Sequence, residues 1–165
     1  MKPVEPSEED KTHAIGFARY AYDYIEAART VDETIGAQEG HEIVSPVPAY
    51  FLAMHGIELT LKAFLRYHGT SVRSLRSPRE YGHDLHACFR RAKELGLLEI
   101  FAMRDGDAKA FELLSKLNAD QGLRYVRTGL NEFPSWAIVA PLAVRLHQAI
   151  APLVGYEKTF RVHFG

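Results

Sequence analysis

The chain of 165 residues has very little cysteine and no long apolar run. Its single cysteine, Cys88, cannot form an intramolecular disulfide, so a disulfide-stapled secreted fold is excluded and a reduced, cytoplasmic setting is expected. The longest apolar run, residues 136–144, has nine residues, whereas a membrane span needs about 20. Residues 1–11 are acidic and lack an apolar stretch. We therefore expect neither a signal peptide nor a membrane contact.

The familiar catalytic signatures are also missing. The sequence holds no Gly-x-Ser-x-Gly elbow, no Gly-x-x-x-x-Gly-Lys phosphate loop, no paired cysteines and no His-Glu-x-x-His pattern. Cys88 falls on the apolar face of an expected helix, which is typical of a small core residue rather than of a nucleophile. The sequence accordingly predicts no metal and no cofactor.

The whole chain has no excess of positive or negative charge, but two of its segments do. The total of 20 basic and 21 acidic side chains gives a formal net charge of −1. Residues 1–42 nevertheless carry ten acidic and four basic side chains, and residues 62–93 carry eight basic and two acidic ones. Because clustered arginines suit phosphate geometry, we expect a phosphate-binding surface in the second segment, formed by Arg73, Arg76, Arg79, Arg90 and Arg91. The alternative is that the acidic first segment packs against the basic one, within the chain or across a dimer.

Apolar side chains recur at helical spacing along most of the chain, which predicts one all-α domain over 1–165 with about five helices. The first helix is expected over 8–35 and ends at Gly36 and Gly40. Ser45-Pro46-Val47-Pro48 stops one element and starts the next, a central buried helix over 49–68 that Gly69 closes. Residues 70–82 are expected to form a loop with room for one short turn.

Three further elements are expected in the second half. A helix capped at His83-Asp84 carries an apolar face and ends at Gly96, and residues 97–103 add a short turn. Asp107 is expected to cap the next helix. Residues 121–134 are irregular, and a final helix over 135–153 should kink or start later because of Pro141. Alternating residues at 123–128 and 159–164 could pair as a small two-stranded ribbon.

A polar stripe crosses the otherwise apolar central helix. Glu58 and Lys62 are four residues apart, in the favourable order for a helical ion pair, and His55 shares their side of the helix. Such a stripe needs partners or water, so it indicates either an ion pair that bridges helices or a ligand or catalytic cluster inside the bundle. Gly56 in the same helix indicates the close approach of another helix.

Histidine and aspartate meet in the segment Gly82-His83-Asp84-Leu85-His86. Both residue types bind zinc-like ions, but a helix cap explains Asp84 or His83 equally well, and we predict no metal site here. His83 joins the candidate polar cluster, which we assign to His55, Glu58, Lys62, His83 and Asp84.

The run from His55 to Leu65, then Gly69, then Gly82-His83-Asp84-Leu85 at a helix start, resembles the HEPN superfamily (higher eukaryote and prokaryote nucleotide-binding domains). Arg124-Tyr125 falls where several members carry an Arg-Tyr pair. The resemblance covers residues 48–96 directly and extends loosely to 153. It implies a helical bundle that usually dimerises, and its members include ribonuclease toxins, partners of nucleotidyltransferases and inactive binding modules.

Three functions stay open. The first is a non-catalytic module that binds nucleotide or RNA phosphates through the five arginines. The second, which the resemblance implies, is a metal-independent endoribonuclease in which His83 moves a proton and Arg76, separated from it by six residues in the Arg-x6-His spacing, stabilises phosphate charge. The third is a structural or regulatory protein whose acidic first helix binds a basic partner chain. A cytoplasmic homodimer is expected in each case.

Overall fold

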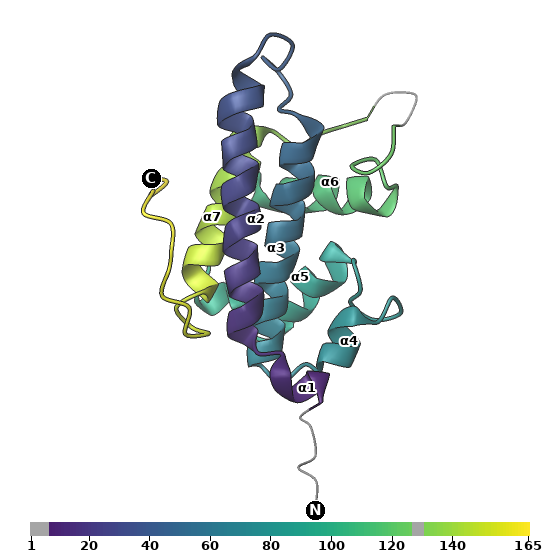
Figure 1. Ribbon diagram of the computed structural model, residues 1–165, viewed down its shortest axis with the longest axis vertical. Coiled ribbons are helices and arrows are strands. Elements are labelled where there is room, and N and C mark those ends of the chain that lie inside the picture. The colour runs from purple at the N-terminus through teal and green to yellow at the C-terminus, as the bar shows by residue number, and fades with distance from the viewer. Residues whose placement is uncertain (1–6, 127–130) are drawn as a thin grey trace, which may run out of the picture.

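Helix α3, Val47–Tyr67, forms the axis of the fold. The computed structural model describes residues 7–126 and 131–165. Fourteen of the 21 residues of α3 are buried, because the helix is covered on nearly all sides. Helix α2, Ala14–Thr34, runs antiparallel beside it, and α7, Trp136–Ile150, packs against both (Figure 1). Helix α5, Leu85–Glu94, covers the remaining side of α3, and helix α6, Asp107–Ala119, packs on α5 and α7.

The described part of the chain is all-α, which confirms the predicted fold class. Two short helices, α1 over Glu8–Lys11 and α4 over Val72–Arg76, supplement the five longer ones. Single 3-10 turns, η1 over Ile35–Ala37 and η2 over Leu97–Glu99, follow α2 and α5. Helix α4 is the short turn expected within 70–82. No helix among the described residues is long and apolar enough to cross a membrane.

The prediction of a single helix over 8–35 is wrong, because the helix is interrupted between α1 and α2. His13, the N-cap of α2, has an extended backbone with φ −104° and ψ 158°. The carbonyl oxygen of Thr12 accepts a hydrogen bond from Nε of Arg66 on α3, at 3.1 Å. A guanidinium therefore takes a carbonyl that a continuous helix would have used internally, and α1 turns toward α4.

Asp84 caps α5 as predicted, since its carboxylate accepts from the backbone N–H of Ala87 at 2.9 Å. The prediction for Asp107 is wrong: Gly106 is the N-cap, and Asp107 is the first helical residue of α6. The carboxylate of Asp107 instead accepts from the backbone N–H of Arg104, at 2.8 Å, and from the Arg145 guanidinium on α7, at 3.1 Å. A buried carboxylate with such a partner links two helices rather than closing one.

Helix α7 starts at Trp136 and continues through Pro141, so the alternative of a later start is not observed. The proline ring leaves residue 141 without the backbone N–H that would donate to the carbonyl of Ala137, four residues earlier. Because Ala137 is exposed, water can satisfy that carbonyl. Further along α7, the fully buried His147 donates from Nε2 to the carbonyl of Ala18 on α2, at 2.9 Å. Burial lowers the pKa of His147, which keeps the ring neutral.

The predicted ribbon is not formed by the residues that the structure describes. Residues 123–126 and 159–164 contain no strand, and residues 127 and 128 lie outside the described ranges. The carbonyls of Phe160 and Val162 accept from the side-chain amide of Gln148 on α7, at 2.9 and 2.7 Å. Phe160 is buried and stacks on Tyr22 of α2, with ring centroids 4.5 Å apart. Side-chain contacts with α2 and α7 thus replace strand pairing.

Gly56 lies where α3 meets α2, as its position in the sequence predicted. A Cβ atom added there would be 2.5 Å from Cγ1 of Ile25 and 3.4 Å from the carbonyl oxygen of Ala21. Gly16, in the first turn of α2, has no such neighbour within 4 Å. Both glycines lie in helices but only Gly56 is closely packed, so Gly16 serves as its control.

We expect Gly56→Ala to lower the free energy of unfolding by about 1–3 kcal/mol, because the new methyl overpacks the α2–α3 contact. Gly16→Ala should leave the stability unchanged or raise it by up to about 1 kcal/mol, because alanine is the better helix former. Urea denaturation of both variants measures the difference. A Gly56→Ala protein as stable as the wild type would contradict the close approach.

Candidate active or binding groove beside a buried ion pair

A buried ion pair lies in the middle of α3. Glu58 is 1 % exposed and Lys62 is 6 % exposed. Nζ of Lys62 donates to Oε1 of Glu58 at 2.9 Å, and also to the carbonyl oxygen of Gly82 in the turn before α5. The predicted pair at i, i+4 is thus present and also bridges two elements. A charge this deeply buried needs such partners, since desolvation of an unpaired ion costs several kcal/mol.

Both histidines of the predicted cluster contact the Glu58 carboxylate. Nδ1 of His83 is 3.2 Å from Oε1, and Nδ1 of His55 is 3.9 Å from Oε2. Oε2 receives no hydrogen bond within the described part of the chain. An ionised carboxylate only accepts, so we assign the proton of the neutral His83 ring to Nδ1. Its Nε2 then keeps a free lone pair on the far side of the ring, and 65 % of the side chain is exposed.

Glu58 stays ionised in spite of its burial. Desolvation is the largest influence on the pKa of Glu58 and raises it, but the nearby His55 ring and the charge and hydrogen bond of Lys62 together lower it below its ordinary value. The thiol of Cys88 lies in the same interior and behaves differently. Burial raises the pKa of Cys88 to about 12, which confirms it as an inert core residue rather than a nucleophile.

A groove with a volume of about 650 Å³ opens beside His83, between the start of α5, the end of α6 and the segment that follows α6. The side-chain amide of Asn118 donates to the carbonyl oxygen of His83, which ties the end of α6 to the start of α5. Oγ of Ser115 is buried in this wall without a hydrogen-bond partner among the described residues. The polar lining residues are His83, Asp84, His86, Ser115, Lys116, Asn118, Gln121, Arg124 and Tyr125.

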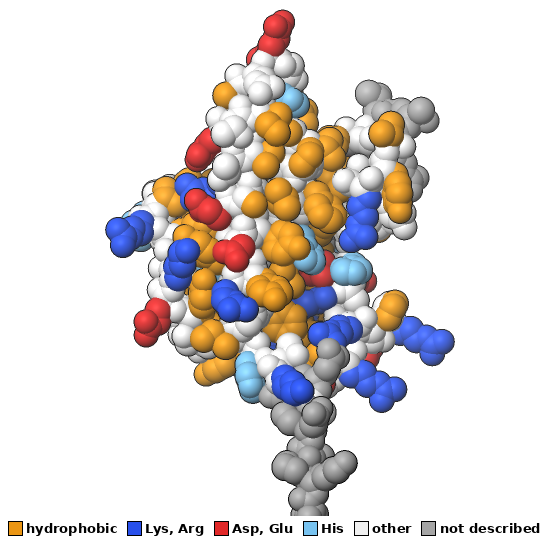
Figure 2. All heavy atoms as spheres, in the orientation of Figure 1, with side chains coloured by type: hydrophobic (Ala, Val, Ile, Leu, Met, Phe, Trp, Pro, Cys, Tyr) orange, Lys and Arg blue, Asp and Glu red, His pale blue; other side chains and the backbone are white. Residues whose placement is uncertain are grey.

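The charge of the groove is positive on one wall. Lys116 and Arg124 are exposed, and neither has an acidic partner in the part of the chain that the structure describes. Asp84 is the one carboxylate among the described lining residues, and it is engaged as the cap of α5. On the face drawn in Figure 2, some of the histidine side chains lie near the middle, with Lys and Arg side chains around them.

The arginines predicted to bind phosphate lie outside this groove. Arg73 and Arg76 are exposed on α4 and line a second groove, of about 600 Å³, together with Glu9. Arg79 follows in the next turn, and Arg90 and Arg91 lie on α5. The predicted catalytic partners Arg76 and His83 therefore line different grooves.

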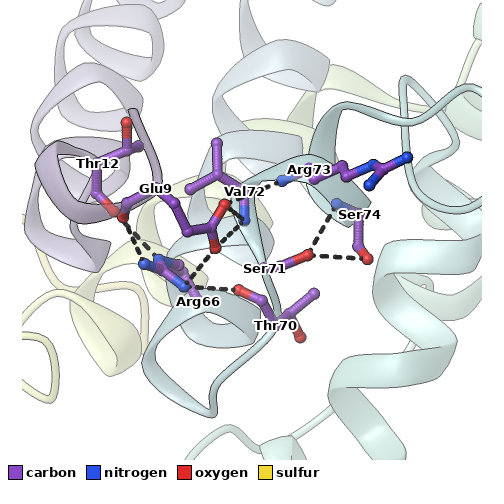
Figure 3. Close-up of polar contacts among 8 residues, drawn as sticks. All are labelled: Glu9, Thr12, Arg66, Thr70, Ser71, Val72, Arg73 and Ser74. Carbon is purple, nitrogen blue, oxygen red and sulfur yellow. Dashed lines mark hydrogen bonds and ion pairs between the residues drawn. The ribbon is translucent and has the colours of Figure 1, made fainter. Parts of the chain in front are cut away.

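Glu9 of α1 reaches into the basic segment (Figure 3). Its carboxylate accepts from the backbone N–H of Val72 at 2.8 Å and from the Arg66 guanidinium at 3.2 Å. The backbone N–H of Arg73 is 3.4 Å from the same carboxylate. The acidic first segment thus packs on the basic one in part, as one of the sequence alternatives proposed. On α5, Arg91 pairs with Glu94 at 2.9 Å.

Sequence reasoning missed most of the groove. Lys116, Ser115 and Asn118 carried no signal, because an isolated polar residue on a helix gives no sign of what it faces. Arg124 and Tyr125 were noted for the alternating pattern of the predicted ribbon and for the family resemblance, and neither signal placed them beside His83. No cluster of three or more metal-ligating side chains exists among the described residues.

Comparison of the chain with protein-family models, with curated proteins and with solved structures finds no match. The HEPN resemblance accordingly stays a prediction. The function is argued below from the groove itself.

We expect acid to destabilise the fold through Glu58. Because the folded-state pKa lies below the unfolded-state value near 4.5, this stabilisation is present above that pH and is lost as the pH falls through the folded-state pKa. Glu58→Gln removes the titrating group, so its free energy of unfolding should depend less on pH between about 3 and about 5. Urea denaturation across this range measures it, with the exposed Glu112→Gln as control. Equal slopes for wild type and Glu58→Gln would contradict the ionised state.

Proposed function

We propose that this protein is a non-catalytic binding module for a phosphate-containing ligand, RNA or a nucleotide. The observation that carries the proposal is the groove beside His83, where Lys116 and Arg124 have no acidic partner among the described residues. Its volume of about 650 Å³ lies within the range usual for small-ligand sites. Unpaired cations beside hydroxyl and amide donors favour an anion with several oxygens, which describes a phosphate ester.

The arginine edge of α4 and α5 extends this positive surface. Arg73, Arg79 and Arg90 are exposed, and Figure 2 has Lys and Arg side chains gathered below the histidines of this face. A ligand longer than one nucleotide would pass from the groove toward this edge. Its phosphates would release counterions, so affinity would fall steeply with salt.

Fluorescence anisotropy with a labelled RNA oligonucleotide tests the proposal. We expect Lys116→Ala and Arg124→Ala each to weaken binding about fivefold to tenfold at low salt and to reduce the salt slope by roughly one. Lys109→Ala on α6 and Arg161→Ala in the tail, both exposed and away from the groove, serve as matched controls and should bind as the wild type does. Absence of binding at low salt, or binding insensitive to salt, would overturn the proposal.

A second candidate, a metal-independent endoribonuclease, is favoured by the hydrogen bond between Glu58 and His83. The carboxylate orients the ring and leaves Nε2 as a base for a ribose 2′-hydroxyl. The 2′-oxygen would displace the 5′-oxygen at phosphorus, giving a 2′,3′-cyclic phosphate and a 5′-hydroxyl that takes its proton from water. Lys116 and Arg124, rather than Arg76, would stabilise the phosphate charge in this groove.

RNA cleavage assays in EDTA separate the two candidates. For a nuclease, His83→Ala should reduce the cleavage rate by about a hundredfold or more, because general base catalysis is lost. His163→Ala, exposed in the tail, should cleave at the wild-type rate. Equal cleavage by His83→Ala and the wild type would exclude His83 as the base, and a wild type that binds RNA without cleaving it leaves the binding module.

We also propose that two copies associate. Apart from the HEPN resemblance, the support is a group of exposed apolar side chains near the start of α3, namely Ile43, Val44 and Val47. Exposed apolar groups of this kind favour a protein contact. Light scattering of the free protein, run beside the binding assays, gives the molar mass, and a single species at the 18.6 kDa of one chain would contradict association.

A further inference from the structure

Planar side chains are stacked in a row beside the groove. The guanidinium of Arg124 lies over the ring of Phe51, with Cζ 5.4 Å from the ring centroid. On α3, the rings of Phe51 and His55 are nearly parallel, at 6°, with centroids 6.3 Å apart. The row therefore begins at the groove with Arg124 and continues along α3.

The inner members of the row are held in place. Tyr24 of α2 contacts the His55 ring edge to face, with centroids 4.5 Å apart, and Nδ1 of His55 is 3.9 Å from the Glu58 carboxylate. Phe51 is half-buried between its two neighbours. One face of the Arg124 guanidinium is thereby fixed against an aromatic ring, which orients the plane of the group.

The row ends at the groove, where Arg124 has an exposed aromatic neighbour in the sequence. Arg124 is exposed, and the next residue, Tyr125, lines the same groove with 64 % of its surface exposed. An aromatic ring with this much exposed surface is packed against few other side chains. Exposed aromatic rings and guanidinium planes beside cations are the groups on which proteins stack unpaired bases.

We infer that Arg124 and Tyr125 form a stacking site for an unpaired base, so that the ligand is a single-stranded nucleic acid rather than a duplex or a free nucleotide. This inference rests on the proposed function and names its ligand. In a duplex the bases are stacked on one another and only the backbone would reach the groove. A free nucleotide would fill the groove but gain nothing from the exposed arginines on α4 and α5.

The residues of the row and of the groove have different roles. Arg124 and Tyr125 touch the base, Lys116 holds a phosphate, and Phe51 is a positioning residue that acts through Arg124. Replacing Arg124 with lysine keeps the positive charge but removes the plane, so it separates stacking from charge. Replacing Phe51 with leucine keeps an apolar side chain but removes the ring that supports the guanidinium.

Anisotropy measurements compare a single-stranded oligonucleotide with a duplex of the same length at one salt concentration. We expect the single strand to bind about tenfold more tightly or better. Arg124→Lys, Phe51→Leu and Tyr125→Ala should each weaken single-strand binding about fivefold or more while leaving duplex binding unchanged, and Tyr125→Phe should restore it. Tyr67→Ala, at an exposed tyrosine of α3 that does not line the groove, and Arg161→Lys are the matched controls.

The outcomes separate the two proposals. Equal affinity for single strand and duplex, with Lys116→Ala still weakened, would overturn the stacking site and leave the proposed function intact. Absence of binding to either oligonucleotide would overturn the stacking site and, together with absence of binding to a mononucleotide, the proposed function as well. If Tyr125→Ala instead changes the molar mass of the free protein and not its affinity for RNA, then a second copy occupies this face and the stacking site is overturned.

Discussion

The buried pair of Glu58 and Lys62 is the constraint on which the rest of the site depends. Two ions placed inside an apolar helix must be paired and hydrogen-bonded, because the interior offers no water to solvate them. Lys62 meets this need with the Gly82 carbonyl, and Glu58 meets it with His83 and His55. The turn before α5 is therefore held against α3, and the His83 ring is fixed at the rim of the groove.

The packing of α2 explains how α3 can hold these charges. Gly56 allows α2 to approach until Ile25 touches the backbone of α3, and Tyr24 closes over His55 one helical turn away from the carboxylate. Water is thereby kept from one side of Glu58, whose second oxygen has no hydrogen-bond donor among the described residues. The opposite side opens through His83 to the groove. The cluster is consequently shielded from water on the α2 side and open to the groove on the His83 side.

Local patterns predicted the parts of this arrangement that lie within one helix. The spacing of Glu58 and Lys62, the close approach at Gly56 and the cap at Asp84 are all consequences of helix geometry, which the sequence specifies directly. The break after Thr12 was not predictable in this way, because it depends on Arg66, which is 54 residues away. Asp107 was wrongly predicted to be a cap because its actual partner, Arg145, is also distant in sequence. Likewise, Lys116 and Arg124 become neighbours of His83 only when the end of α6 packs beside the start of α5.

The charge of a sequence segment predicts an anion-binding surface less well than the charges that lie close together in the fold. The basic stretch 62–93 suggested that its five arginines make the ligand surface, yet Glu9 neutralises Arg66 beside them and Arg91 is paired with Glu94. Lys62 belongs to the same stretch, but it forms an ion pair with Glu58 in the interior of the fold. Lys116 and Arg124 come from a region of balanced charge but have no acidic partner among the described residues. Since an anion is attracted by uncompensated charge, the phosphate ligand that we propose would bind in the groove first, and a longer ligand would reach the arginine edge.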